Sequence, residues 1–306
     1  MTSERAFVGV SALFFAASVA LTIVWCASMQ AMGGMPMPGG WTMSMTWMRM
    51  PGQSWPGSAA TFLAMWTVMM VAMMLPSLVP MLLHYRAAVA TTGGTRLGLL
   101  TAIASAGYFF VWTAVGMAAF AAGVTLAAIE MRHPTVSRAV PIASAVIVLI
   151  AGSLQFTTWK ARHLSRCRGV RHDRLPATAF TAFRHGTSLG LRCVSCCANL
   201  NVILLVIGLM DLRAMAVVTA AITAERLSRS GERIARVTGA VIIAAGVILI
   251  VARGTGQSRG GAIVPSIPVP ESLQFARIHG TGAPYPLGSQ SRNSRRKPRK
   301  EKRDEY

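Results

Sequence analysis

The chain has 306 residues, of which 53% are hydrophobic and only 13% charged, and its formal net charge is +20. Ordinary soluble domains contain about 25% charged residues, so the composition excludes a soluble globular protein and indicates a membrane protein. Seven Lys and Arg lie between residues 160 and 184 and four between 226 and 236. Basic residues grouped in this way encode membrane topology, so we expect membrane lipids and no nucleic acid as partners.

Six apolar runs approach the length of about 20 residues that spans hydrocarbon. The first begins near the N-terminus and is too long for a cleaved signal, so we interpret it as a retained signal anchor. A shorter seventh run is either a further span or a partly inserted helix. The six runs cover residues 7–29, 59–83, 98–122, 139–158, 190–210 and 233–252, and the seventh covers 212–225. The sequence therefore predicts an all-α fold, a polytopic transmembrane helical bundle of six or seven spans.

The distribution of basic residues predicts the orientation of the spans. The most basic connections are the segments 159–187 and 226–236. The loop at 30–58, in contrast, has Arg49 as its single basic residue. By the positive-inside rule the two basic segments are cytoplasmic and the loop is outside. We therefore expect a cytoplasmic N-terminus, with Ser44 outside and Ser165 inside.

The chain divides into two regions by composition. Residues 1–252 form an integral membrane helical domain, which includes the outer loop at 30–58. Residues 253–306 are rich in Gly, Pro and Ser and end in a basic run. This tail lacks the apolar content of a core, so we expect it to be disordered. Its basic run favours contact with anionic lipid.

Eight of the 19 methionines lie between residues 29 and 50. The loop carries Met-x-Met pairs, which include Met35 with Met37 and Met43 with Met45. Thioether sulfur is a soft, neutral ligand, and soft ligands select Cu(I). The Gly and Pro between the pairs keep the segment from folding on its own, so we expect these four side chains to wrap a soft ion. The alternative is a flexible connector of biased composition.

Six more methionines lie between residues 65 and 81, in the second apolar run. On an ideal helix they fall within one half of the circumference, and Met70, Met73 and Met74 are candidate metal ligands. Pro76 and Pro80 should interrupt this helix and free backbone carbonyls. The alternative is that methionine fills irregular gaps between packed helices.

Cysteines cluster in the fifth run as Cys193, Cys196 and Cys197. Their spacing places three thiols on one helix face, and we expect them near the start of the helix, where thiolate and metal binding are favoured. One helix cannot close a compact metal site, so a further ligand is needed. The candidates are His163 and Cys167 in the preceding loop, or a methionine of the second run. Buried cysteine is also common as a small hydrophobic residue.

Several segments together resemble one bacterial family of integral membrane proteins, catalogued as a domain of unknown function and described as predicted metal-binding proteins. MWTVMMVAMMLP at 65–76 resembles its W-x-x-M-x-x-A-M-M-x-P signature, and GLRCVSCC at 190–197 resembles its G-x-x-C-x-G-C-C signature. Weaker similarity covers 155–168 and 208–226, where His163 replaces a cysteine of the family pattern. The resemblance implies a metal-binding protein of the bacterial inner membrane.

The leading hypothesis is a membrane protein that binds, transports or delivers a soft metal ion, with Cu(I) as the suspected ion and no catalytic residues. The outer loop would capture the ion, the second span would carry it and the thiols would hold it. One alternative is an enzyme, a membrane thiol-disulfide oxidoreductase that uses Cys193 and Cys196. Another is a structural membrane protein that binds no metal. Protein partners are not indicated.

Overall fold

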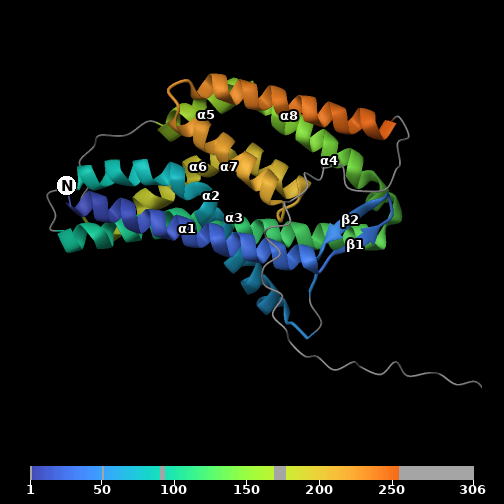
Figure 1. The fold of residues 1–306 in the computed structure, drawn as a ribbon, viewed down its shortest axis with the longest axis horizontal. Helices are drawn as coiled ribbons and strands as arrows, with labels where there is room; N and C mark the ends of the chain where they lie inside the picture. The colour runs from blue at the N-terminus through green and yellow to red at the C-terminus, as the bar shows by residue number, and fades with distance from the viewer. Residues whose placement is uncertain (1, 50–51, 90–93, 169–176, 255–306) are drawn as a thin grey trace, which may run out of the picture. The chain divides into compact units, whose positions relative to one another are not determined.

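The computed structural model describes residues 2–49, 52–89, 94–168 and 177–254, which form a bundle of helices with one small β-hairpin (Figure 1). The predicted all-α fold is therefore confirmed. The predicted tail lies almost entirely outside the described residues. In chain order the elements are α1 (Thr2–Ala31), β1 (Gly34–Met37), β2 (Trp41–Ser44), a 3₁₀ turn (Met45–Trp47), α2 (Trp55–Ala88), α3 (Gly94–Arg132), α4 (Pro134–Leu154), α5 (Thr158–Arg168), α6 (Ala179–Ile207), α7 (Leu212–Leu227) and α8 (Gly231–Gly254).

Within the described residues, five helices are long and apolar enough to cross a membrane: α1, α2, α3, α4 and α6. This number is compatible with a multi-pass membrane protein. The sixth predicted run is helical as α8, but α8 is not one of the five. The shortest run forms α7, whose 16 residues rise about 24 Å, less than the roughly 30 Å of a hydrocarbon core.

The outward faces of the helices are apolar. Side chains that are more than 60% exposed include Leu13 and Phe14 of α1, Ile142 of α4, and Val241 and Ile248 of α8. Soluble proteins rarely expose large contiguous apolar patches, whereas lipid is an apolar solvent for such surfaces. The exposed faces therefore agree with the membrane class inferred from composition.

The second helix runs unbroken from Trp55 to Ala88 through both internal prolines. The expectation that Pro76 and Pro80 interrupt the helix is wrong. Each proline removes one backbone donor, but α1, α3 and α7 pack against α2 and hold it in place. Contacts of this kind allow a transmembrane helix to tolerate proline. The methionine face of α2 therefore stays continuous.

Glycines let α3 and α6 approach each other closely. An added Cβ at Gly186 would lie 1.9 Å from the carbonyl oxygen of Ala104, and one at Gly190 would lie 3.0 Å from that of Tyr108. Small residues permit this backbone contact between membrane helices. The close approach places Cys193, one turn after Gly190, against the middle of α3.

We expect Gly186→Ala to destabilise the protein severely, because the new methyl group meets backbone rather than a flexible side chain. The cost should be at least about 3 kcal/mol, the upper end for overpacked cores, and a thermal melt in detergent measures it. Gly98→Ala is the matched control, because a Cβ at Gly98 of α3 has no neighbour within 4 Å. Equal melting temperatures for the two variants would contradict the close contact.

The methionine-rich segment folds as a β-hairpin. Its antiparallel register pairs Met35 with Met43 and Met37 with Trp41, and Gly39 and Gly40 take positive φ values in the turn, as glycine allows. Within the protein the segment is therefore an ordered hairpin and not the flexible connector of the alternative interpretation.

The hairpin is held by contacts with the ends of α3 and α4. Met37 and Met43 are 8% and 2% exposed and pack on Ala127. Trp41 Nε1 donates a hydrogen bond to the carbonyl of Ser137 at 3.0 Å, and the Ser137 hydroxyl donates to the carbonyl of Pro38 at 2.9 Å. Docking on the bundle thus supplies the order that the segment lacks alone.

Candidate metal centre

The three clustered thiols lie in the middle of α6. The helix begins at Ala179, where the Thr178 side chain caps it, so Cys193 stands almost four turns inside. The expectation that the thiols lie near the start of the helix is therefore wrong. The residues before the thiols are also part of α6, because Gly186 lets them pack closely on α3. Any effect of the helix terminus falls off within its first turn, so it does not act on these thiols.

All three thiols are buried, with exposed fractions of 0% for Cys193, 1% for Cys196 and 2% for Cys197. The Sγ of Cys193 lies 3.8 Å from that of Cys197, and the Sγ atoms of Cys196 and Cys197 are 3.4 Å apart. The one-turn spacing of Cys193 and Cys197 brings their sulfur atoms together on one face.

A thioether of α2 completes the sulfur cluster. The Sδ of Met74 lies 3.9 Å from the Sγ of Cys193, although the two residues are 119 positions apart. Met70, Met73 and Met74 are 0%, 2% and 0% exposed and belong to the same buried cluster as the thiols. The structure thus brings the predicted methionine face and the predicted thiols into contact.

These distances suit a small soft ion. A metal–thiolate bond of about 2.3 Å, the length seen for zinc, places the sulfur ligands of one ion about 3.8–4.0 Å apart. The distances from the Cys193 sulfur to the sulfur atoms of Cys197 and Met74 both match this spacing. In the described part of the chain, no three His, Cys, Asp or Glu side chains are grouped to hold a metal ion. A three-ligand centre here therefore needs the thioether as well as two thiols.

The basic connection before α6 contains the short helix α5, which lies against the thiols. Cys167 is 4% exposed and belongs to the same buried cluster as the three thiols. His163 is instead half-buried and contacts Trp159, with ring centroids 4.4 Å apart. Of the two predicted loop ligands, the structure places Cys167 in the cluster with the thiols, whereas His163 packs against Trp159.

Two polar side chains that the sequence did not indicate point at Cys193. The Tyr108 hydroxyl donates a hydrogen bond to its Sγ at 3.0 Å, and Arg226 Nη1 donates to the same sulfur at 3.0 Å. Arg226 is 4% exposed and also reaches the Ser77 hydroxyl at 2.7 Å and the Met81 Sδ at 3.1 Å. A charged residue inside an apolar protein is itself a signal of function, and this signal could have identified Arg226.

A buried ion pair lies next to the backbone of Cys196. Lys160 Nζ is 2.7 Å from Glu225 Oε2, and Lys160 also donates a hydrogen bond to the carbonyl of Cys196 at 2.7 Å. Gln155 Nε2 donates to Glu225 Oε1 at 3.0 Å. The pair joins α5, α7 and α6, so it fixes the backbone that carries the thiols.

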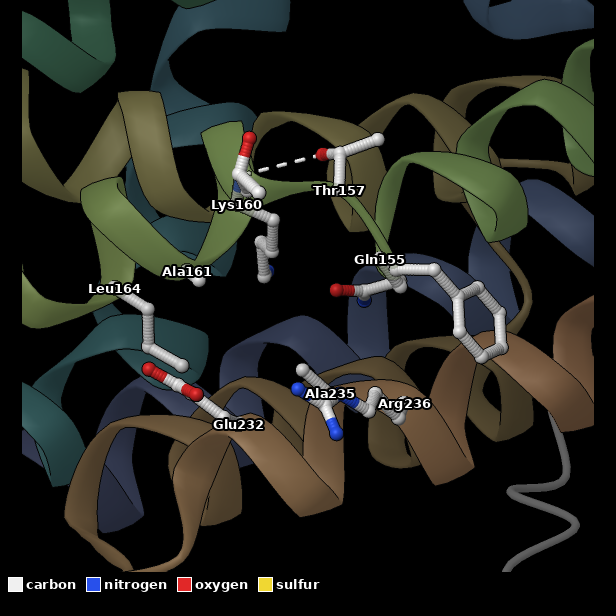
Figure 2. A pocket seen from close by; sticks show the side chains of 10 residues that line it. Gln155, Thr157, Lys160, Ala161, Leu164, Glu232, Ala235 and Arg236 are labelled. Atoms are coloured by element: carbon white, nitrogen blue, oxygen red, sulfur yellow. Dashed lines mark hydrogen bonds between the residues drawn. The ribbon is translucent and has the colours of Figure 1, made fainter.

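A cavity of about 80 Å³ borders Lys160 of this ion pair, together with Gln155, which bonds to its carboxylate. Figure 2 shows Lys160 and Gln155 facing the cavity from one side. On the opposite side lies α8, which carries Glu232 and Arg236. One water molecule needs roughly 10–15 Å³ of such space, so the cavity has room for several. There is therefore room for water next to Lys160, on the side of the thiol cluster where the ion pair lies.

The four predicted ligands of the methionine-rich loop lie apart from the thiols. Met37 and Met43 belong to the separate small cluster under the hairpin, and Met35 packs against it from a half-buried position. Met45 begins the 3₁₀ turn and is also half-buried. Three of these thioethers therefore share the hairpin face that is turned toward α3.

The fold and the site define a class: a protein of membrane-type helices with a buried cluster of thiols and thioethers. Residues 63–249 match the model of the PpoB2 family, described as a copper chaperone, and the chain belongs to this family. No curated protein and no solved structure matches the chain. The matched segment contains Met74, Cys193 and Arg226, whereas α1 and the hairpin precede it.

Proposed function

We propose that this protein is a membrane-embedded Cu(I) chaperone that holds the ion between Cys193, Cys197 and Met74 and delivers it without catalysing a reaction. The observation that carries the proposal is the contact of Cys193 with Met74 and Cys197 inside the bundle. Thiolate and thioether sulfur select Cu(I) among common biological ions. Membership of a copper chaperone family supports copper as the cargo.

Arg226 supplies the charge that such a centre requires. A complex of Cu(I) with two thiolates carries one net negative charge, and burying it without a partner is costly. The guanidinium at 3.0 Å from Cys193 compensates this charge, whereas Lys160 and Glu225 already neutralise each other. A bound ion therefore leaves the centre neutral overall.

The methionine face of α2 provides a path for the ion. Met65 and Met74 are nine residues apart, about 14 Å along the helix, and the methionines between them are buried on the same side. Met65 lies on the hairpin side, because Phe62 one turn earlier contacts Trp47. Exchange between neighbouring thioethers would carry Cu(I) from the hairpin end to the thiols.

The orientation proposed from the basic residues places this path across the bacterial inner membrane. The N-terminus and Ser165 face the cytoplasm, and Ser44 of the hairpin faces outside. Thioethers then face the oxidising side, where thiols would be lost to disulfides, and thiols lie deeper. Met35, Met37 and Met43 of the hairpin, with Met45 just after it, are the proposed capture ligands.

The burial of the thiols favours metal binding over the alternative of thiol-disulfide exchange. Exchange requires that a substrate disulfide reach the attacking sulfur, whereas Cys193 and Cys196 are at most 1% exposed. A purely structural protein would not need a buried arginine against a thiol. The copper-binding proposal accounts for both features.

We expect the triple substitution Met70→Leu, Met73→Leu and Met74→Leu to weaken Cu(I) binding while the protein stays folded. Leucine keeps volume and apolarity and usually costs below about 1.5 kcal/mol per site, but it has no sulfur to donate. The affinity should fall at least about tenfold, because one of the three proposed ligands is lost and changes around metal ligands alone cost about 10–100-fold. Competition with a chromogenic Cu(I) chelator, on protein purified in detergent, measures the change.

The matched control is Met117→Leu in α3, because this methionine is 46% exposed and away from the thiols. Its Cu(I) affinity should equal that of the unmodified protein. If the triple variant binds as tightly as this control, the α2 thioethers are packing residues and the proposed path fails.

A further inference from the structure

A second pair of sulfur ligands lies at the hairpin end of the bundle. The Sγ of Cys26 is 3.9 Å from the Sδ of Met210, and the two side chains are 2% and 9% exposed. Cys26 belongs to the last turns of α1, and Met210 to the turn between α6 and α7. Met29, one turn after Cys26 on the same helix face, lines a cavity together with Met210.

Backbone contacts fix the position of Met210. Gln30 Nε2 donates a hydrogen bond to its carbonyl at 3.1 Å, which ties the turn to α1. Gly208 ends α6 with a φ of 138°, a conformation that glycine adopts readily. Asp211 then caps α7 by accepting hydrogen bonds from two backbone N–H groups. The thioether is therefore held against Cys26 by both ends of its turn.

The cavity beside this sulfur pair has a volume of about 250 Å³. One water molecule needs roughly 10–15 Å³ of such space, so the cavity accommodates an ion together with several waters. The cavity is lined by Met29, Gln30, Gly33, Gly34, Ser44 and Met210. Access to the sulfur pair thus runs along the base of the hairpin.

We propose that Cys26, Met29 and Met210 form a second Cu(I) site, at which the ion enters before it reaches the thiols of α6. This inference rests on the copper function proposed above. Two sulfur atoms 3.9 Å apart can both lie about 2.3 Å from one ion, a usual metal–sulfur distance. Binding replaces the thiol proton of Cys26 by the ion, and the proton leaves to solvent in the cavity.

The two sites are separate and differ in charge. Cys197 lies ten residues before the end of α6 at Ile207, a distance of about 15 Å, and Met210 lies beyond that end. One thiolate and two neutral thioethers make a neutral complex with Cu(I), so no buried cation is needed. The deeper centre offers an additional thiolate and the Arg226 guanidinium. Fewer thiolates make the second site the weaker one, which suits transfer inward.

Copper stoichiometry of the full chain in detergent tests the second site, with Cu(I) supplied from a chromogenic chelator. We expect about two ions per unmodified chain that the chelator does not remove, one for each set of ligands that contains a thiol. The outer variant, Cys26→Ser with Met210→Leu, should lose one ion. The inner variant, Cys193→Ser with Cys196→Ser and Cys197→Ser, should lose the other, and the combined variant should retain no ion against the chelator. Met32→Leu, at an exposed position one residue past the end of α1, is the matched control.

The single substitution Met210→Leu, which keeps the side-chain volume, should weaken the outer site at least tenfold, and a melting curve checks its folding. An outer variant that keeps both ions at unchanged affinity overturns the second site and leaves the proposed function intact. Loss of an ion in the outer variant supports the second site, even if the inner variant keeps all its copper. An inner variant that keeps all its copper would overturn only the proposed α6 centre.

Discussion

Replacing Cys193, Cys196 and Cys197 together by serine is expected to remove the tightest Cu(I) site of the protein. Serine is close to cysteine in size, but its hard oxygen is a poor ligand for a soft ion. Changes to the groups around metal ligands already cost 10–100-fold in affinity, so loss of the ligands themselves should cost at least about 100-fold. Chelator competition on purified protein measures the highest-affinity constant.

The fold should survive this change, because Gly186 and Gly190 still hold α6 against α3. Ser195→Ala is the matched control, since the Ser195 hydroxyl bonds only to its own helix, at the Leu191 carbonyl. A triple variant that melts like this control and binds Cu(I) equally well would show that the thiols are packing residues. Copper binding would then have to be assigned elsewhere.

Glu225→Ala is expected to destabilise the protein strongly by leaving Lys160 charged and unpaired in the core. The two side chains are 2% and 3% exposed, and breaking a buried ion pair from one side typically costs about 3–5 kcal/mol. The Lys160 ammonium would keep only the Cys196 carbonyl and a longer contact with Asn199. A thermal or denaturant melt in detergent measures the loss.

Two comparisons separate this effect from simple truncation. Glu232→Ala removes an exposed carboxylate of α8 and should change stability by less than about 0.5 kcal/mol, as at ordinary surface sites. The double variant Lys160→Met with Glu225→Leu removes both charges and should recover most of the stability, because apolar replacements of buried pairs are often neutral. If Glu225→Ala melts like Glu232→Ala, the ion pair does not contribute to the fold.

The sequence by itself determined the membrane class, the helical fold and the set of soft ligands. Long apolar runs can satisfy their backbone in lipid only as helices, so composition and length suffice to predict them. The spacing of Cys193, Cys196 and Cys197 predicts a shared helix face because one turn of helix is a local property. The methionines of α2 share a helix face for the same reason. The effect of the prolines in α2, however, depended on the neighbouring helices.

Only the tertiary structure decided which ligands meet. Met74 and Cys193 are 119 positions apart, and Cys26 and Met210 are 184 apart, so no local pattern connects them. The start of α6 and the docked hairpin likewise depend on contacts with α3 and α4. Lys160 and Glu225 neutralise each other across two helices, and Arg226 is held in the core by hydrogen bonds to Ser77 and Cys193 of other helices. Burial of charge is a property of the assembled bundle, and for this reason the sequence identified the soft ligands but not the charges around them.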